Sequence, residues 1–326
     1  MENDKAKLSR RIVMSSTHID KHRTKMTKEA LESGLEFING DRKPRLGLEH
    51  NQTLPPLGRI NNGEVVQGDD GEYYLVADQE FFDIQESIIL SNGLALIIES
   101  FSDKNFPFVE CEFEEIDKIK IKYDFVNFES YQKGKEFITE LQKNSEVEFD
   151  GSVFSRKSAI PDPEIIIRIT EVLGIALGIG LRKIPEKLGD AIGEDLAKFY
   201  RLLSNTIKKS VLELLPKNQP IHFIVEIPFE KSLVELIVTT RNPDIALNAY
   251  NREAISKLRS DMDVLINTFN AEKIQYFLNE NNIWELNYML TKEGKVIGTK
   301  KSFKRRNDFF QEMIEKQNEI DKKNNA

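Results

Sequence analysis

The chain has 326 residues, of which 40% are hydrophobic and 31% charged, and it carries a net charge of −8. This composition is typical of a globular protein, and the length suits two domains of ordinary size. The negative charge argues against a protein that coats nucleic acid, and the single cysteine, Cys111, excludes an intramolecular disulfide and any metal site with several cysteine ligands.

The first region, residues 1–128, predicts short strands and one early helix. Its charged start leads into no apolar signal-peptide core, so we expect a cytoplasmic protein. Residues 11–16 are strand-like, and Thr27 has the features of an N-cap for a helix that ends at Gly40. Asp70-Gly71 is typical of a hairpin turn. Further extended segments are expected at 46–50, 64–67, 72–76, 93–99, 109–113 and 119–128. Many short strands with regular turns favour a small β-barrel with a helix.

The next two regions differ sharply in polarity. Residues 129–163 are polar and end in a proline pair, which predicts a linker. Residues 164–215 read as helical. Within them, residues 190–215 form an amphipathic pattern that could pack on its own chain or on a second copy, giving a homo-oligomer.

The last region, residues 216–326, predicts a small α+β domain. Strand patterns at 221–227 and 233–238 are followed by a helix over 244–268 and by strands at 273–278 and 284–291. We therefore expect a helix on one face of an antiparallel sheet, and an α+β class for the whole chain.

Two segments have unusual composition. The run 172–181 is apolar and contains Gly174 and Gly178, but a bilayer span needs about 20 apolar residues. It reads as a tightly packed core or interface helix, and alternatively as a membrane-active segment, the one place where membrane contact is expected. The basic run from Lys300 to Arg306 is interpreted as a solvated helix face rather than a phosphate-binding site.

The histidines other than His50 give weak signals. His18 and His22 are four residues apart, which is the spacing of two metal ligands on one helical face, but no third ligand is near. His222 lies inside an apolar strand and is interpreted as a hydrogen-bonded structural residue. No nucleotide-binding or metal signature occurs, so no cofactor is expected.

His50 has the most informative surroundings. It ends the apolar run 46–50 and is followed by the turn Pro56-Leu57-Gly58-Arg59. A histidine held at the end of a strand suits a general base, which must be fixed in place. A histidine that is merely hydrogen-bonded to the backbone is the plainer alternative.

These motifs resemble the prohead maturation proteases of tailed phages, which share a fold with herpesvirus assemblin. The similarity covers residues 11–128: an opening strand, a loop leading into a helix that Ile19–Leu31 resembles, a strand that delivers the histidine, and a Pro-Leu-Gly-Arg turn. It implies a serine nucleophile about 45 to 50 residues after the histidine. Ala95 occupies that position, and a methyl group cannot attack a carbonyl.

Other groups could complete a catalytic set under a shifted alignment. Ser100 or Ser91 could act as the nucleophile with His50 as the base. Asp117 or Glu115 could orient the imidazole, although each is more simply a surface carboxylate.

Three functions follow from these residues. The first is a serine-type peptidase that uses His50 and Ser100. The second is a protease-like domain that has lost catalysis, recognises a protein or peptide partner, and is coupled to a C-terminal interaction module in a phage-related or phage-defence setting. The third is a regulated membrane-acting or oligomerising effector that uses residues 172–215. Ala95 favours the second.

Overall fold

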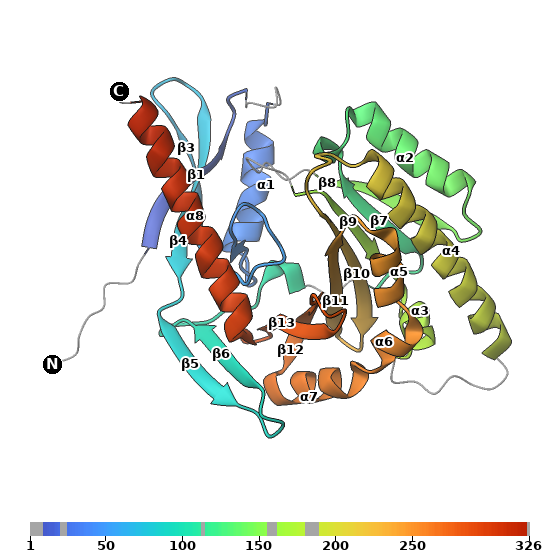
Figure 1. Ribbon diagram of the computed structural model, residues 1–326. Coiled ribbons are helices and arrows are strands. Elements are labelled where there is room, and N and C mark those ends of the chain that lie inside the picture. The colour runs from blue at the N-terminus through green and yellow to red at the C-terminus, as the bar shows by residue number, and fades with distance from the viewer. Residues whose placement is uncertain (1–8, 20–24, 112–114, 155–161, 180–188, 325–326) are drawn as a thin grey trace. The chain divides into compact units, whose positions relative to one another are not determined.

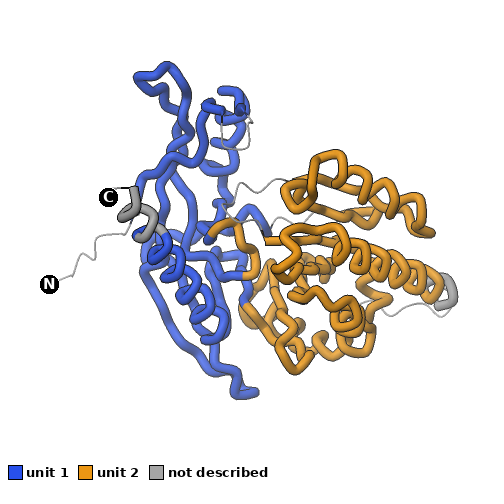
Figure 2. The backbone as a smooth tube through the Cα atoms, turned by 45° about the horizontal axis from the view of Figure 1, so that its top comes forward, with its two compact units in different colours: residues 1–48, 54–112, 288–326 blue, residues 49–53, 113–287 orange. Residues whose placement is uncertain are grey.

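The computed structural model describes residues 9–19, 25–111, 115–154, 162–179 and 189–324. These residues form a mixed protein of helices and sheets, which agrees with the expected class at that level (Figure 1). They belong to two compact units, shown in Figure 2. Unit 1 consists of residues 1–48, 54–112 and 288–326, and unit 2 of residues 49–53 and 113–287. The expected boundaries at 128, 163 and 215 do not coincide with these units, because residues far apart in the chain complete unit 1.

One part of unit 1 is an antiparallel four-stranded sheet in the order β1-β4-β3-β2. Its strands are β1 (Ser9–Ser16), β2 (Arg45–Leu46), β3 (Gly58–Gln67) and β4 (Tyr73–Phe81). The helix α1 (Lys28–Asn39) packs against β3 and β4, where Leu31 and Ile38 join a core that includes Leu75 and Ala77. The expected N-cap is confirmed, since the Thr27 side chain accepts a hydrogen bond from the Ala30 amide.

The other part of unit 1 brings together residues from both ends of the chain. Strands pair in the order β5-β6-β14-β13. They are β5 (Ile84–Ile89), β6 (Ala95–Ser100), β13 (Trp284–Thr291), whose first four residues belong to unit 2, and β14 (Val296–Thr299). The helix α8 (Lys300–Asn324) follows β14 and packs against β6. The strand expected at 109–113 is wrong: Val109–Cys111 is a 3-10 turn (η1), in which buried Cys111 packs with Phe108.

The basic run at the start of α8 is only partly solvated. Lys304 is exposed and pairs with Asp308, as expected for a solvated face. Arg306 is buried, and its guanidinium makes two hydrogen bonds of 2.6 and 3.0 Å to the carboxylate of Glu99 on β6. The interpretation was wrong for Arg306 because its counter-charge lies 207 residues away in the chain.

The Pro-Leu-Gly-Arg turn has a structural role inside unit 1. A Cβ atom at Gly58 would lie 1.8 Å from the carbonyl oxygen of Glu80, so only glycine allows β3 and β4 to approach this closely. Arg59 is buried beside it. Its Nε donates to the Glu80 carboxylate at 2.5 Å, and its guanidinium lies 4.0 Å from the centre of the Phe101 ring.

We predict that Gly58→Ala lowers the free energy of unfolding by about 2 kcal/mol, because the added methyl group forces β3 and β4 apart. Urea denaturation followed by circular dichroism measures this. Gly47→Ala is the matched control, since a Cβ at Gly47 meets no atom within 4 Å. Equal stability of the two variants would contradict the prediction.

Unit 2 contains a mixed sheet in the order β12-β11-β10-β9-β7-β8. The strands are β7 (Ile119–Asp124), β8 (Phe149–Phe154), β9 (Glu164–Arg168), β10 (Ile221–Phe229), β11 (Ser232–Thr240) and β12 (Ala271–Leu278). The expected antiparallel sheet is only partly right. The pairs β7–β8, β9–β10 and β11–β12 are parallel, because helices return the chain to the same direction between the strands.

The helices of unit 2 follow the strands closely in sequence. They are α2 (Tyr131–Lys143), α3 (Glu171–Ala176), α4 (Gly189–Glu213), α5 (Pro243–Ala249), α6 (Arg252–Ser256) and α7 (Arg259–Phe269), with a 3-10 turn η2 (Phe125–Asn127). The expected linker at 129–163 therefore holds α2 and β8 among its described residues. The polar side chains of α2 lie on its exposed face, while Phe137, Ile138 and Leu141 are buried.

The apolar run and the amphipathic helix are both packed within the chain. Of residues 172–181, residues 180 and 181 lie outside those described; Leu173, Leu177 and Ile179 are buried. Across the described residues, we find no helix with the length and hydropathy needed to cross a membrane. The stripe of α4 (Phe199, Leu203 and Ile207) is buried where α4 packs on α2, α3 and α5, so its apolar face is used inside the chain.

Candidate functional site

His50 lies in the loop Glu49–Thr53 of unit 2. The strand expected to deliver it ends earlier, at Leu46, where β2 loses its pairing with β3. Glu49 and His50 instead adopt left-handed backbone angles, with φ of 46° and 59°, and both side chains are exposed. Two consecutive non-glycine residues in this region are uncommon, and such backbone conformations concentrate at functional sites.

The loop is held by its own residues and by the sheet of unit 2. The Asn51 side-chain oxygen accepts from the Thr53 amide at 2.8 Å, and its amide group donates to Asp162 at 3.2 Å. The carbonyl oxygens of Gln52 and Thr53 accept hydrogen bonds from side chains on β12 and β13. The loop is therefore tied to the sheet at Gln52 and Thr53, and to the segment just before β9 at Asn51.

The sheet face that carries these donors mixes polar and apolar side chains, whereas the opposite face is mainly apolar. Residues that pair across strands project from the same face, so His222, Ile224 and Glu226 of β10 share a face with Thr239, Ile237 and Glu235 of β11. On the opposite face the central side chains of β9, β10 and β11 are apolar and buried: Ile165, Ile167, Phe223, Val225, Ile227, Val234, Leu236 and Val238.

His222 is hydrogen-bonded, in agreement with its interpretation as a structural residue. Its Nδ1 lies 2.7 Å from the Thr239 hydroxyl, and its Nε2 lies 4.0 Å from the Asp162 carboxylate. Asp162 is also the acceptor for Asn51, so this histidine and the loop share one carboxylate.

The candidate nucleophiles all belong to unit 1, whereas His50 belongs to unit 2. Ser100 is buried at the end of β6, and Ala95 is exposed at its start. Ser91 is exposed in the turn between β5 and β6. Glu115 and Asp117 are exposed, which agrees with their reading as surface carboxylates.

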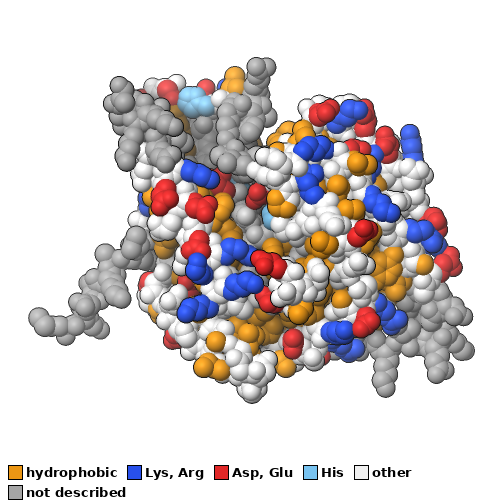
Figure 3. Space-filling view, viewed as in Figure 1, with side chains coloured by type: hydrophobic (Ala, Val, Ile, Leu, Met, Phe, Trp, Pro, Cys, Tyr) orange, Lys and Arg blue, Asp and Glu red, His pale blue; other side chains and the backbone are white. Residues whose placement is uncertain are grey.

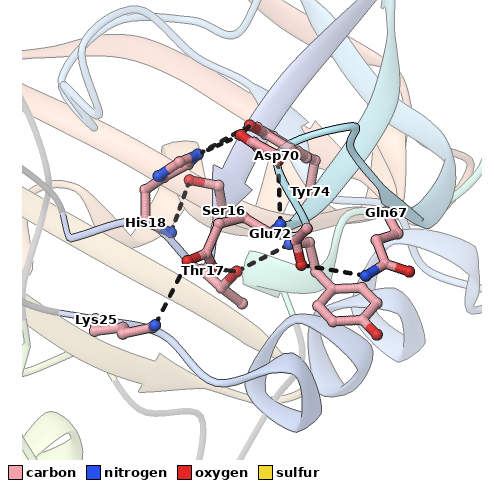
Figure 4. Close-up of polar contacts among 10 residues, drawn as sticks. Ser16, Thr17, His18, Lys25, Gln67, Asp70, Glu72 and Tyr74 are labelled. Atoms are coloured by element: carbon pink, nitrogen blue, oxygen red, sulfur yellow. Dashed lines mark hydrogen bonds and ion pairs between the residues drawn. The ribbon is translucent and has the colours of Figure 1, made fainter.

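A second polar cluster surrounds His18 in unit 1 (Figure 4). The His18 Nε2 lies 3.0 Å from the Asp70 carboxylate and 2.9 Å from the Tyr74 hydroxyl, which itself donates to Asp70 at 2.5 Å. The hydrogen bond from Tyr74 is the main cause that lowers the pKa of Asp70, and the same bond raises the pKa of Tyr74. A hydrogen bond from Thr17 lowers the pKa of Glu72.

These contacts give His18 a hydrogen-bonding role at the hairpin between β3 and β4. Its proposed metal partner, His22, lies outside the described residues. Among the described residues, no group of three or more His, Cys, Asp or Glu side chains is arranged to hold a metal ion.

The strand β1 was expected at residues 11–16, but its position at the edge of the sheet was not predicted. Within the described residues it pairs with β4 on one side only. Val13 and Met14, in its centre, are 57% and 43% exposed. The sequence held one signal, since two adjacent apolar residues in a strand cannot both face a core on one side of the sheet.

Charges of both signs are mixed on the face of the molecule shown in Figure 3, where Lys and Arg side chains are interspersed with Asp and Glu. Comparisons with protein-family models, with curated proteins and with solved structures found no match.

Proposed function

We propose that this protein recognises a protein partner without cleaving it, by adding an extended segment of that partner to the edge of β1. The domain similar to prohead maturation proteases would supply this edge, coupled to a C-terminal interaction module in a phage-related or phage-defence setting. The observation that carries the proposal is the strand β1, with one paired edge among the described residues and with Val13 and Met14 exposed.

The chemistry of an edge strand selects this kind of ligand. Its outer N–H and C=O groups are satisfied best by another extended main chain, and neighbouring apolar side chains add specificity. Natural proteins usually protect such edges with charges or prolines. The edge strand β5 has the exposed Glu86 near its middle. The strand β1 has its exposed arginines, Arg10 and Arg11, near its start, and has Val13 and Met14 in its middle, where its pairing with β4 contains a bulge.

Loss of catalysis fits the residues at the expected nucleophile positions. Ala95 has no nucleophilic atom, and the Ser100 side chain is buried in unit 1. The loop that carries His50 is suited to contact because its exposed polar side chains are held on a fixed backbone.

We predict that the double substitution Val13→Lys with Met14→Lys lowers binding to an immobilised library of random twelve-residue peptides at least tenfold, because lysines on an edge oppose strand addition. Ile89→Lys is the control, since Ile89 is 76% exposed on the edge strand β5. Peptides that bind both variants as well as the unsubstituted protein would contradict the proposal.

A hydrolysis assay distinguishes the peptidase alternative. We expect no cleavage of casein or of the bound peptides by the purified protein. Cleavage that disappears in both His50→Ala and Ser100→Ala would replace the recognition proposal with a serine peptidase.

A further inference from the structure

The strand β1 contains a bulge at Met14 that changes which side chains face α1. Ile12, before the bulge, pairs with Ala77, and Ser15, after it, pairs with Leu75. Both partners belong to the core that α1 joins. Paired residues project from the same face of a sheet, and side chains alternate between the faces along a strand. Even-numbered residues before the bulge and odd-numbered residues after it therefore share the face of α1.

The start of β1 carries an exposed cation. Arg10 is exposed, and it lies on the same face as Ile12. The neighbouring Arg11 projects from the other face, where carboxylates of β3 and β4 bind its guanidinium at 2.8 and 3.2 Å. Arg11 is thus neutralised within its own copy, whereas Arg10 can reach a carboxylate outside the sheet.

The other end of the same edge is acidic. The Thr17 hydroxyl donates to the carboxylate of Glu72, and Asp70 lies beside them in the hairpin between β3 and β4 (Figure 4). Lys25 lies 3.7 Å from Glu72, whose side chain is still 32% exposed. A carboxylate accepts several hydrogen bonds, so Glu72 can also bind an arginine from outside the sheet.

We infer that the outer edges of β1 in two copies of this chain pair antiparallel about a two-fold axis. In such a pair, residue i of one copy lies opposite residue j of the other, and j lies opposite i. Opposite residues share a face, so an even-numbered residue before the bulge must lie opposite an odd-numbered residue after it. The register centred on β1 meets this condition, with Arg10 opposite Thr17 of the second copy and Val13 opposite Met14.

This register is complementary in polarity and in charge. It covers the exposed Val13 and Met14 with each other, once on each side of the axis. It also brings each Arg10 to Glu72 of the other copy, because Thr17 binds Glu72 and opposite residues on paired strands lie only about 5 Å apart. A parallel pairing would place Arg10 next to Arg10, which is unfavourable.

Self-pairing goes beyond the recognition of a partner proposed above, because the chain itself supplies the added strand. The two processes compete for one edge, so a dimer would withhold β1 until a peptide replaces the second copy. A pairing of single strands makes a small interface, and small interfaces suit weak, reversible association.

A mixture of two charge-reversed variants tests the pairing by sedimentation velocity of the full chain over a micromolar concentration series. We expect the unsubstituted chain to dimerise reversibly. Arg10→Glu alone and Glu72→Arg alone should each dimerise about tenfold more weakly, because each places like charges opposite each other twice. An equimolar mixture of the two should dimerise within about threefold of the unsubstituted chain, since both contacts then join opposite charges.

Glu86→Arg, on the edge strand β5, is the matched control. It should leave dimerisation unchanged, and mixing it with Arg10→Glu should restore nothing. If circular dichroism shows that Glu72→Arg does not fold, the double substitution Val13→Lys with Met14→Lys takes its place and should give a monomer.

Two results would overturn the inference: an unsubstituted chain that is monomeric throughout the series, or a mixture of folded variants that stays as weak as each alone. Neither result depends on a peptide. A monomer that binds peptides at β1 would refute self-pairing alone, and a dimer that binds none would refute recognition alone.

Discussion

Arg306→Ala is expected to lower the free energy of unfolding by about 3–5 kcal/mol, the usual cost of leaving one member of a buried ion pair without the other. The substitution removes both hydrogen bonds to Glu99 and a third, of 2.8 Å, to the carbonyl oxygen of Pro56. Glu99 would keep the hydrogen bond from Gln85 at 3.1 Å, which does not neutralise its charge. Urea unfolding monitored by circular dichroism measures the loss.

Two further variants make the Arg306 result specific. Lys304→Ala changes an exposed lysine of the same helix and should alter stability by less than about 0.5 kcal/mol. The double variant Arg306→Met with Glu99→Met should recover most of the lost stability, because no buried charge is left uncompensated. A double variant as unstable as Arg306→Ala would show that shape, rather than charge, explains the effect.

Arg241→Ala is expected to cost about 3 kcal/mol, since a charged donor that binds several carbonyls contributes more than a neutral one. Its guanidinium donates to four backbone oxygens, at 2.5 to 3.1 Å, where α4 ends and the chain turns toward β10. These acceptors are the carbonyls of Val211, Leu214, Pro216 and Gln219. Thermal unfolding in calorimetry measures the loss in unit 2.

Arg241→Lys separates the geometry of the side chain from its charge. An ammonium group cannot reproduce the planar fork of a guanidinium, so lysine should recover less than half of the stability. Arg252→Lys, at an exposed position on α6, should have little effect. If Arg241→Lys were as stable as the unsubstituted protein, the positive charge alone would be sufficient to stabilise the C-terminal end of α4.

Elements with local signals were predicted well from the sequence. The helix expected between Thr27 and Gly40 and the hairpin expected at Asp70-Gly71 both occur within a few residues of the expected positions. Capping and turn preferences, which depend only on neighbouring residues, are sufficient to predict these two elements. Residues 129–154 misled the prediction because the apolar side of α2 is narrow and its polar side dominates the composition.

Features that depend on distant partners were not predictable in this way. Arg306 was interpreted as part of a solvated face, and nothing in the sequence marked Arg59 or Lys273 as buried. Each is nevertheless buried against a carboxylate, which lies 21 residues away for Arg59, 38 for Lys273 and 207 for Arg306. The periodicity of hydrophobic residues does not indicate which distant carboxylate a buried arginine or lysine will bind. A lone Glu235 within an apolar strand was the available hint, because a buried charge requires a partner.

The conformation of the loop that carries His50 was not predicted from the sequence. His50 was singled out by its neighbours, and it lies in a loop with an unusual backbone. The expected strand-end geometry was wrong, since Glu49 and His50 have left-handed backbone angles. The next residues, Gln52 and Thr53, accept hydrogen bonds from side chains more than 220 residues further along the chain, which local patterns do not reveal.

The discontinuous course of unit 1 has a consequence for synthesis on the ribosome. Residues 113–287 can assemble most of unit 2 as soon as they emerge, whereas unit 1 must wait for β14 and α8, which come last. Until then β6 lacks its neighbour β14, although it can pair with β5, and Glu99 lacks Arg306. During synthesis, the edge of β6 that later pairs with β14 would therefore remain exposed. We expect chaperones to bind this part of the nascent chain until residues 296–306 have left the ribosome.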